Sequence, residues 1–418
     1  MERHQSVKVI RLLVAFAILP FCLCSATTRQ VKKNSALFSL QDAINKSQPY
    51  DTILVFSGSY FEKNITVKKP LVIKGIGKPV LDGEDKYEIL SIYSSHVVIE
   101  GFELRHSGKS SMNDIAGIKI YFSKNVTIRN NELHDMFFAI YFQECSKCLV
   151  VDNRILSSGS TEVQSGNGIH CWKCDSMKVI HNTISGQRDG IYFEFVTNST
   201  ISNNLSKENI RYGLHFMFSH HNTYSENIFQ NNGAGVAVMY TRDVKMINNT
   251  FSDNWGGAAY GLLMKDISDS HVEQNKFLNN TIGIYMEGSS RIIIRSNNFA
   301  NNGCALRVQA SCDDNIIENN NFSTNTFDVN TNGSLVLNTF RNNYWDKYEG
   351  YDLNHDGIGD VPFHPVSMYA MIIDRIPVAA IFLRSFMVTL LDKTEKAIPS
   401  ITPENFKDDL PLMKPITL

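Results

Sequence analysis

Short apolar runs of two or three residues recur along most of the chain, and each is followed by a polar phrase rich in asparagine. The phrase takes forms such as "VTIRNNEL", "VKMINNTF" and "IIIRSNNF", and one asparagine in it returns every 21 to 29 residues. A unit of about 22 residues built from short, β-branched, alternating segments is typical of one coil of a solenoid. The repeating asparagines are Asn131, Asn153, Asn182, Asn203, Asn227, Asn249, Asn275, Asn297 and Asn320.

This pattern predicts an all-β fold, a right-handed parallel β-helix in which the short strands of successive coils stack about 4.8 Å apart. The segments are too short and too β-branched for helical repeats, and no leucine-rich phrase is present. We expect the asparagine amides to form an internal ladder that satisfies the backbone where the coils turn.

The first 26 residues have a different pattern. A basic start, a short apolar run and small residues before a cut after Ala26 indicate a secretory signal peptide over residues 1–26. An uncleaved anchor is the less favoured alternative, because the apolar run is too short to span a bilayer comfortably. The 40 Lys and Arg nearly balance the 42 Asp and Glu, without long runs, which argues against a nucleic-acid partner. The signal peptide predicts a mature protein that is soluble outside the cytoplasm.

The solenoid needs a cap at each end. Residues 27–95 are expected to form the N-terminal cap and the first coils, with an amphipathic helix around Leu40–Ile44 and a strand at Thr52–Phe56. The β-helix repeats are expected over residues 96–345. Residues 346–418 then form a C-terminal cap and a tail that contains a helix.

The strand that follows the glycine of each coil can be phased by its alternation. Its first and third positions are apolar in six coils, so we expect them to fill the bore, with Cys171, Met264 and Met286 as core residues. The second and fourth positions must then face outward. The outward set of interest is His170, Glu194, His215, Met217 and Met239.

These five residues would lie on one face across four consecutive coils. Glu194, Met217 and Met239 would be neighbours in a column, whereas His170 and His215 would be two coils apart. Thioether and imidazole ligands suit copper, especially Cu(I), which makes this face a candidate copper site. The alternative is an outer surface whose His and Met residues bind nothing. His220 and His221 lie at the turn just beyond.

Two CxxC pairs, "CSKC" at 145–148 and "CWKC" at 171–174, lie about one coil apart. Because Cys145 and Cys174 fall at equivalent positions while Cys171 faces inward, a Cys145–Cys174 disulfide or free thiols are favoured over a four-thiolate zinc site.

The segment "YDLNHDGIGD" matches most of the spacing of a calcium-binding EF-hand loop. Its ligands would be Asp352, Asn354, Asp356 and Asp360, but Phe363 stands where the bidentate Glu belongs. A hydrogen-bonded capping turn is the alternative.

Several longer phrases resemble the NosD family over nearly the whole chain. The most specific are "GNGIHCWKCDSMKVIHN", "RYGLHFMFSHHNTYSEN", "NNGAGVAVMYTRDVKMINN" and the closing "NNYWDKYEGYDLNHDGIGDVPFHP". The resemblance implies a periplasmic accessory protein, not an enzyme, that serves copper-centre assembly of nitrous oxide reductase in denitrification.

The same resemblance implies partners and cargo. They are an ABC transporter made of the permease NosY and the ATPase NosF, a membrane-anchored copper chaperone, nitrous oxide reductase itself, and transiently bound copper. The stretch "IPVAAIFLRSFMVTLLDKTEKAI" could supply a docking helix for the permease, or could pack across the open end of the β-helix.

A carbohydrate-binding or carbohydrate-cleaving β-helix is the alternative function. Cleavage needs clustered carboxylates in an outer groove, and the outward Glu194 and Glu287 are dispersed over several coils. A passive adhesin is a third reading, which leaves the face of His and Met unexplained.

Overall fold

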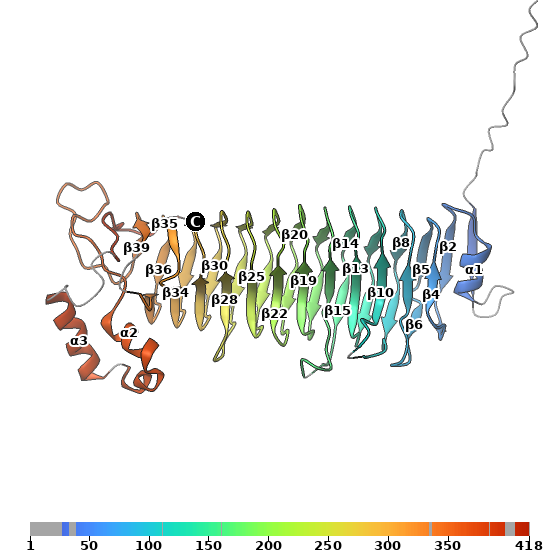
Figure 1. The fold of residues 1–418 in the computed structure, drawn as a ribbon, viewed down its shortest axis with the longest axis horizontal. Helices are drawn as coiled ribbons and strands as arrows, with labels where there is room; N and C mark the ends of the chain where they lie inside the picture. The colour runs from blue at the N-terminus through green and yellow to red at the C-terminus, as the bar shows by residue number, and fades with distance from the viewer. Residues whose placement is uncertain are drawn as a thin grey trace, which may run out of the picture.

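A computed structural model describes residues 27–32, 39–110, 112–159, 161–333, 337–383, 385–397 and 406–417. The chain winds into a long rod of three parallel sheets, with a cap at each end (Figure 1). The parallel β-helix predicted from the repeat is confirmed. The predicted signal peptide lies outside the described residues.

Each coil contributes one strand to each of three sheets, here named A, B and C. Sheet A contains β1 (Thr28–Val31), β2 (Thr52–Phe56), β5 (Val72–Ile76), β8 (Val98–Glu100), β11 (Thr127–Arg129), β14 (Leu149–Val151), β17 (Lys178–Ile180), β20 (Thr200–Ser202), β23 (Thr223–Ser225), β26 (Lys245–Ile247), β29 (His271–Glu273), β32 (Ile293–Arg295), β35 (Asp313–Glu318) and β38 (Leu337–Arg341). Sheet B contains β3 (Ser59–Tyr60), β6 (Val80–Asp82), β9 (Glu103–Arg105), β12 (Glu132–His134), β15 (Arg154–Leu156), β18 (Thr183–Ser185), β21 (Leu205–Lys207), β24 (Ile228–Gln230), β27 (Thr250–Ser252), β30 (Lys276–Leu278), β33 (Asn298–Ala300), β36 (Asn321–Ser323) and β39 (Tyr344–Trp345). Sheet C contains β4 (Ile65–Val67), β7 (Leu90–Ile92), β10 (Ala116–Tyr121), β13 (Phe138–Gln143), β16 (Ile169–Trp172), β19 (Asp189–Glu194), β22 (Tyr212–Met217), β25 (Ala234–Met239), β28 (Tyr260–Lys265), β31 (Ile282–Glu287), β34 (Cys304–Val308) and β37 (Phe327–Asn330).

The bore is filled by one side chain from every second strand position, as the alternation predicted. Cys171, Met264 and Met286 are fully buried core residues. Along sheet B the rings of Phe251 and Phe277 stack with centroids 4.6 Å apart, and their neighbours in adjacent coils stack at 4.8 and 5.5 Å, so the core is continuous along the rod. Apolar burial on this scale is the dominant stabilising contribution to the fold.

The predicted asparagine ladder is present with one correction. After Asn131, the Oδ1 atom of each ladder asparagine accepts hydrogen bonds from the backbone N–H and the Nδ2 of the asparagine one coil earlier, as Asn249 does from Asn227 at 3.0 Å for both. In one coil the ladder position is Asn204, not Asn203, because Ser206 rather than Leu205 points inward there. The ladder asparagines are Asn131, Asn153, Asn182, Asn204, Asn227, Asn249, Asn275, Asn297, Asn320 and Asn343.

A second ladder, which the repeat phrase does not reveal, runs along the turn before sheet C. Each amide again bonds to the next coil, for example Asn232 to Asn254 through the backbone N–H at 3.0 Å. Its members are Asn209, Asn232, Asn254, Asn280, Asn302 and Asn325.

Both ends of the bore are covered. The helix α1 (Leu40–Lys46) and the strand β2 lie where the sequence predicted a helix and a strand, and Ser39 caps the helix by accepting from the Asp42 N–H. At the other end Asp408 accepts hydrogen bonds from Asn343 and Trp345, so the final described segment closes the ladder.

The remaining C-terminal elements are α2 (Met368–Arg375), the 3₁₀ helix η1 (Pro377–Phe382) and α3 (Phe386–Ala397), which lie beyond the last coil (Figure 1). None of the helices described is long and apolar enough to cross a membrane.

Candidate metal face and outer groove

Sheet C carries two columns of outward side chains, and its register places the predicted residues in them. His170, Tyr192 and His215 follow one another in one column on β16, β19 and β22. Trp172, Glu194, Met217 and Met239 follow one another in the second column. Sequence phasing therefore placed these residues on the correct face, with His170 and His215 separated by one aromatic coil.

The two histidines are outward but covered, which the phasing did not anticipate. His170 is 8% exposed and His215 is 6% exposed. The ring of Tyr192 lies between them, with its centroid 4.8 Å from each imidazole centroid. Tyr141 and Tyr212 cover the outer sides of the pair, at 4.4 and 4.8 Å. On this surface each imidazole thus packs between two aromatic rings.

His215 is oriented by a buried ion pair. Asp189 is fully buried and takes a bidentate pair of hydrogen bonds from Arg211, at 2.9 and 2.6 Å. The second of these oxygens lies 3.4 Å from Nδ1 of His215. A carboxylate can only accept, so Nδ1 carries the proton and Nε2 carries the lone pair. That Nε2 is buried without a hydrogen-bond partner among the described residues.

His170 has the opposite tautomer. Its Nδ1 lies 3.0 Å from Nδ2 of Asn167, whose Oδ1 accepts from Nε of Arg188 at 3.3 Å. The arginine fixes which end of the amide faces the imidazole, so Nδ1 accepts and Nε2 carries the proton. This Nε2–H is also buried without a partner in the described part of the chain. Burial lowers the pKa of His170 to about 3, which keeps the ring neutral.

Met217 and Met239 are direct neighbours in the β22–β25 register and are both half-buried. In a parallel sheet such neighbours lie roughly 4.8 Å apart, so both thioethers can reach one ion. His215 precedes Met217 by two residues on the same face. The register therefore places Glu194, Met217 and Met239 in one column and His215 in the adjoining column, on the same strand as Met217.

The turn residues His220 and His221 are engaged at the edge of sheet C. Nδ1 of His221 lies 2.7 Å from a carboxylate oxygen of Asp243, and His220 accepts from the backbone N–H of Arg242 at 3.2 Å. Burial and the nearby Arg242 lower the pKa of His220. The Nδ1 atoms of both histidines therefore already have partners at the corresponding turn of the next coil.

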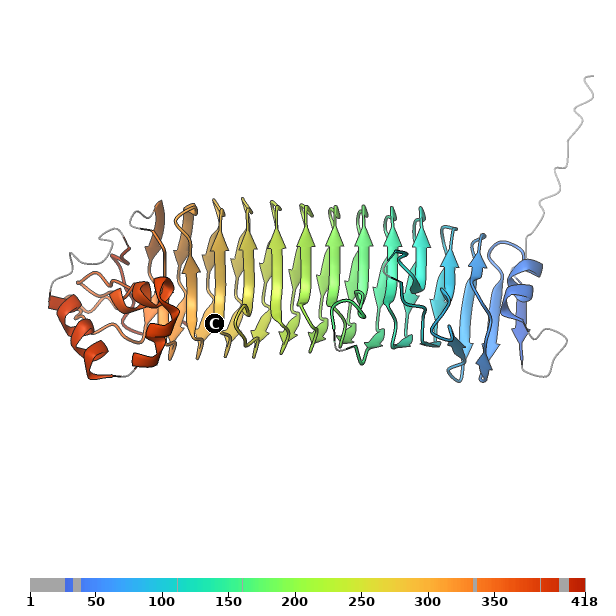
Figure 2. The same cartoon turned by 60° about the horizontal axis from the view of Figure 1, so that its bottom comes forward.

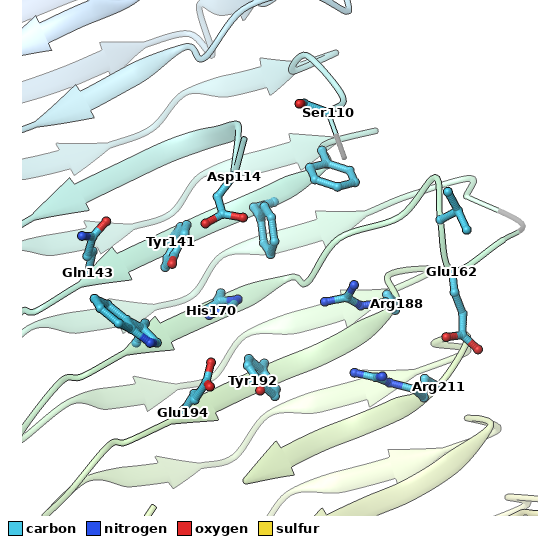
Figure 3. A pocket seen from close by; sticks show the side chains of 14 residues that line it. Ser110, Asp114, Tyr141, Gln143, Glu162, His170, Arg188, Tyr192, Glu194 and Arg211 are labelled. Carbon is cyan, nitrogen blue, oxygen red and sulfur yellow. The ribbon is translucent and has the colours of Figure 1, made fainter. Parts of the chain in front are cut away.

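An outer groove of about 690 Å³ opens over the N-terminal part of sheet C (Figure 3). Its floor is formed by Tyr141, His170 and Tyr192, with Glu194 on one side and Arg188 on the other. The remaining lining residues are Ser110, Asp114, Phe137, Phe138, Gln143, Glu162, Val163, Trp172 and Arg211. Periodicity alone did not reveal this groove, because two irregular connections build its walls.

The four cysteines of the CxxC pairs are buried and have free thiols in this structure. Sγ of Cys174 accepts from the backbone N–H of Cys145 at 3.4 Å, as a serine hydroxyl does at the equivalent turn of a later coil, where Val196 bonds to Ser219. Hydrogen bonds from Cys148 and Cys174 lower the pKa of the Cys145 thiol below its ordinary value. The Cys174 thiol thus takes part in a hydrogen bond between adjacent coils. The Cys145–Cys174 disulfide stays a prediction.

The acidic loop bonds to itself. Asp352 accepts from the backbone N–H groups of Asp356 and Gly357, and Asp360 accepts from that of Leu353. The aromatic ring of Phe363, at the position that a bidentate Glu would need, packs 5.2 Å from Trp345 at the end of the core. These contacts are those of a capping turn, and calcium binding by Asp352, Asn354, Asp356 and Asp360 stays a prediction.

Within the described ranges, no group of three or more His, Cys, Asp and Glu side chains is arranged to hold a metal ion.

The fold and this face define a parallel β-helix protein with a soft-ligand face and an adjoining groove on one sheet. A family model described as "Periplasmic copper-binding protein (NosD)" matches residues 155–351. A Pseudomonas aeruginosa protein named "Probable ABC transporter binding protein NosD" is 29% identical over 84% of this chain and 86% of its own length. A Stutzerimonas stutzeri protein of the same name is 26% identical over 85% of each chain. The resemblance to the NosD family is confirmed by this family model and by relatives that match over most of the chain.

Solved structures share the fold alone. The catalytic domain of a GH87 α-1,3-glucanase aligns with a TM-score of 0.59 at 13% identity, over 77% of this chain and 69% of that one. A Yersinia enterocolitica family 28 exopolygalacturonase aligns with a TM-score of 0.51 at 9% identity, over 77% and 79%.

Proposed function

We propose that this protein is a periplasmic copper-handling subunit that works with an ABC transporter of the NosF and NosY type. In this role it would pass copper from a membrane-anchored chaperone toward the copper centres of nitrous oxide reductase. The family description and the names of the two relatives support the copper, periplasmic and transporter parts of this proposal. It acts by binding rather than by catalysis, and the two relatives are named as probable ABC transporter binding proteins.

The observation that carries the proposal is the adjoining set of His215, Met217 and Met239. Two thioethers in register and one imidazole form a soft donor set that suits Cu(I) better than a hard cation. Asp189 holds His215 in the tautomer whose Nε2 has a lone pair to offer. Copper is a transient cargo here, and a site with few donors and partly exposed sulfurs allows it to leave.

An anaerobic Cu(I) titration against a chromogenic competing chelator tests this site. The double variant Met217→Leu/Met239→Leu keeps side-chain volume but removes both sulfurs, so we expect its affinity for Cu(I) to fall by about 100-fold or more, roughly 2.7 kcal/mol. The matched control is Met264→Leu, which removes a sulfur from the bore one coil later and should leave affinity unchanged. Equal affinities in the double variant and the control would overturn the assignment.

The C-terminal helices present the apolar surface through which the protein would sit on its permease. Ile381 is 79% exposed and Phe386 is 81% exposed, and Val378 and Met387 are exposed beside them. An exposed apolar patch of this kind usually marks an interaction site. It lies at the end of the rod, beyond the last coil (Figure 1).

We expect Ile381→Glu/Phe386→Glu to move the full-length protein from the membrane fraction to the soluble periplasmic fraction of cells that express the transporter. Two buried charges would oppose an apolar interface by desolvation. Phe61→Glu, an exposed aromatic residue at the opposite end, is the control and should remain with the membranes. Retention of the double variant in the membrane fraction would exclude these helices as the dock.

A further inference from the structure

The two connections that wall the groove are unusually long. The connection from β9 to β10 has ten residues and that from β15 to β16 has twelve, counted between the printed strand ends, whereas β12–β13, β18–β19 and β24–β25 are joined by three. Both long connections project from the same side of the rod (Figure 2). In solenoids, insertions within individual repeats map to loops on one face, which is often the binding face.

The groove contains hydrogen-bond donors that no acceptor of the described chain satisfies. The Nε2–H of His170 is buried, and the relay from Arg188 through Asn167 fixes it as a donor. Nε of Arg188 is used in the same relay, which leaves its two terminal amino groups facing the groove, without a carboxylate partner in the described ranges. The neighbouring Arg211 is already paired with Asp189. An unpaired guanidinium beside a buried N–H is suited to a carboxylate.

The rest of the lining supplies the complementary chemistry. Glu194 and Gln143 offer acceptors on the side opposite Arg188 (Figure 3). The half-buried rings of Trp172 and Tyr192 also line the groove. Three neighbouring strands, β13, β16 and β19, form the floor, which spans roughly 10 Å at the parallel-strand spacing. A volume of about 690 Å³ lies within the usual range of small-molecule sites.

We propose that this groove binds a short acidic oligosaccharide, with one uronate carboxylate on Arg188 and the Nε2–H of His170. Its hydroxyl groups would donate to Glu194 and Gln143, and its apolar sugar faces would lie on Trp172 and Tyr192. Donors, acceptors and ring faces are all needed by a hydroxylated ring that carries a carboxylate, whereas a bare anion would need only the donors. This inference does not rest on the copper proposal, because neither methionine lines the groove, although Glu194 borders both surfaces.

The test is calorimetric titration of the mature protein with trigalacturonate, maltotriose and tri-alanine. We expect trigalacturonate to bind at least about tenfold more tightly than either of the others. Equal binding of neutral maltotriose would overturn carboxylate recognition, and equal binding of tri-alanine would reassign the groove to peptides. Absence of trigalacturonate binding at millimolar concentration would overturn the proposal.

Variants locate the site. Arg188→Ala should weaken trigalacturonate binding at least about tenfold, and Arg188→Lys should weaken it less, because lysine keeps the charge but loses the bidentate fork. Arg291→Ala, which removes an arginine paired with Asp269 at a remote turn, is the matched control. Met217→Leu/Met239→Leu should bind trigalacturonate normally, which separates this site from the copper face. Unchanged binding in a folded Arg188→Ala protein would place the ligand elsewhere.

Discussion

The Asn249→Ala variant is expected to lose about 3 to 6 kcal/mol of unfolding free energy. The side chain of Asn249 accepts from the N–H and Nδ2 of Asn227, and its own Nδ2 donates to Tyr224 O and to Oδ1 of Asn275. Truncation leaves several of these buried groups unpaired, and each such group costs about 1 to 3 kcal/mol. Equilibrium unfolding in guanidinium chloride measures the loss.

The adjacent Asn248 provides the control. It is exposed and has a left-handed backbone with φ of 55°, so Asn248→Gly removes a side chain without straining the turn. Its stability should stay close to that of the wild type. Equal losses for Asn249→Ala and Asn248→Gly would show that the ladder contributes nothing specific. In a solenoid, where each coil contacts only its neighbours, the Asn249 lesion should also localise to the coils beside it.

The sequence was sufficient for the architecture because the β-helix obeys two simple periodicities. The coil repeat located the strands and the first ladder, and the alternation of side chains sorted Met264 and Met286 inward and Met217 and Met239 outward. The error at Asn203 has a local cause. Ser206 points inward and donates to Gly213 O. Because the repeat pattern assigns the inward position to the apolar residue beside it, Leu205, it predicts the ladder asparagine one residue too early.

The candidate site was less predictable because it depends on contacts between coils. Alternation shows that His170 and His215 face away from the bore, but not that aromatic neighbours cover them. The tautomers depend on Asn167 and Asp189, which lie at strand ends outside the alternating pattern. The groove depends on two long connections whose course no repeat specifies. A sequence signal for it does exist in the wider spacing of the repeat between Asn153 and Asn182.

Asp189→Asn is expected to have the second large effect, about 3 to 5 kcal/mol of unfolding free energy at neutral pH. The substitution leaves Arg211 without its buried carboxylate, and breaking one side of a buried ion pair is costly. Asp269→Asn removes a carboxylate from the exposed pair with Arg291 and should have a far smaller effect. Unfolding of both variants in guanidinium chloride at pH 7 makes the comparison.

The pH dependence of this effect has a definite sign. Burial opposes ionisation of Asp189, but hydrogen bonds from Arg211 and His215 outweigh it and hold its pKa below the ordinary value of 3.8. A carboxyl group whose pKa is lower in the folded state stabilises the protein above its unfolded pKa, and this contribution is lost as the pH falls through the folded pKa. The difference in unfolding free energy between the wild type and Asp189→Asn should therefore be constant from pH 7 to about pH 5 and become smaller below about pH 4. An unfolding free-energy difference that became larger on acidification would contradict this expected sign.

The same substitution links the buried pair to copper. An asparagine can turn its amide N–H toward Nδ1 of His215, which would move the imidazole proton to Nε2 and remove the lone pair available to a metal. Loss of such a supporting group typically lowers metal affinity about 10- to 100-fold, so Asp189→Asn should bind Cu(I) more weakly although every proposed ligand remains. Cu(I) affinity equal to that of the wild type, in a protein shown by circular dichroism to be folded, would mean that His215 is not a ligand and that the two methionines act without it.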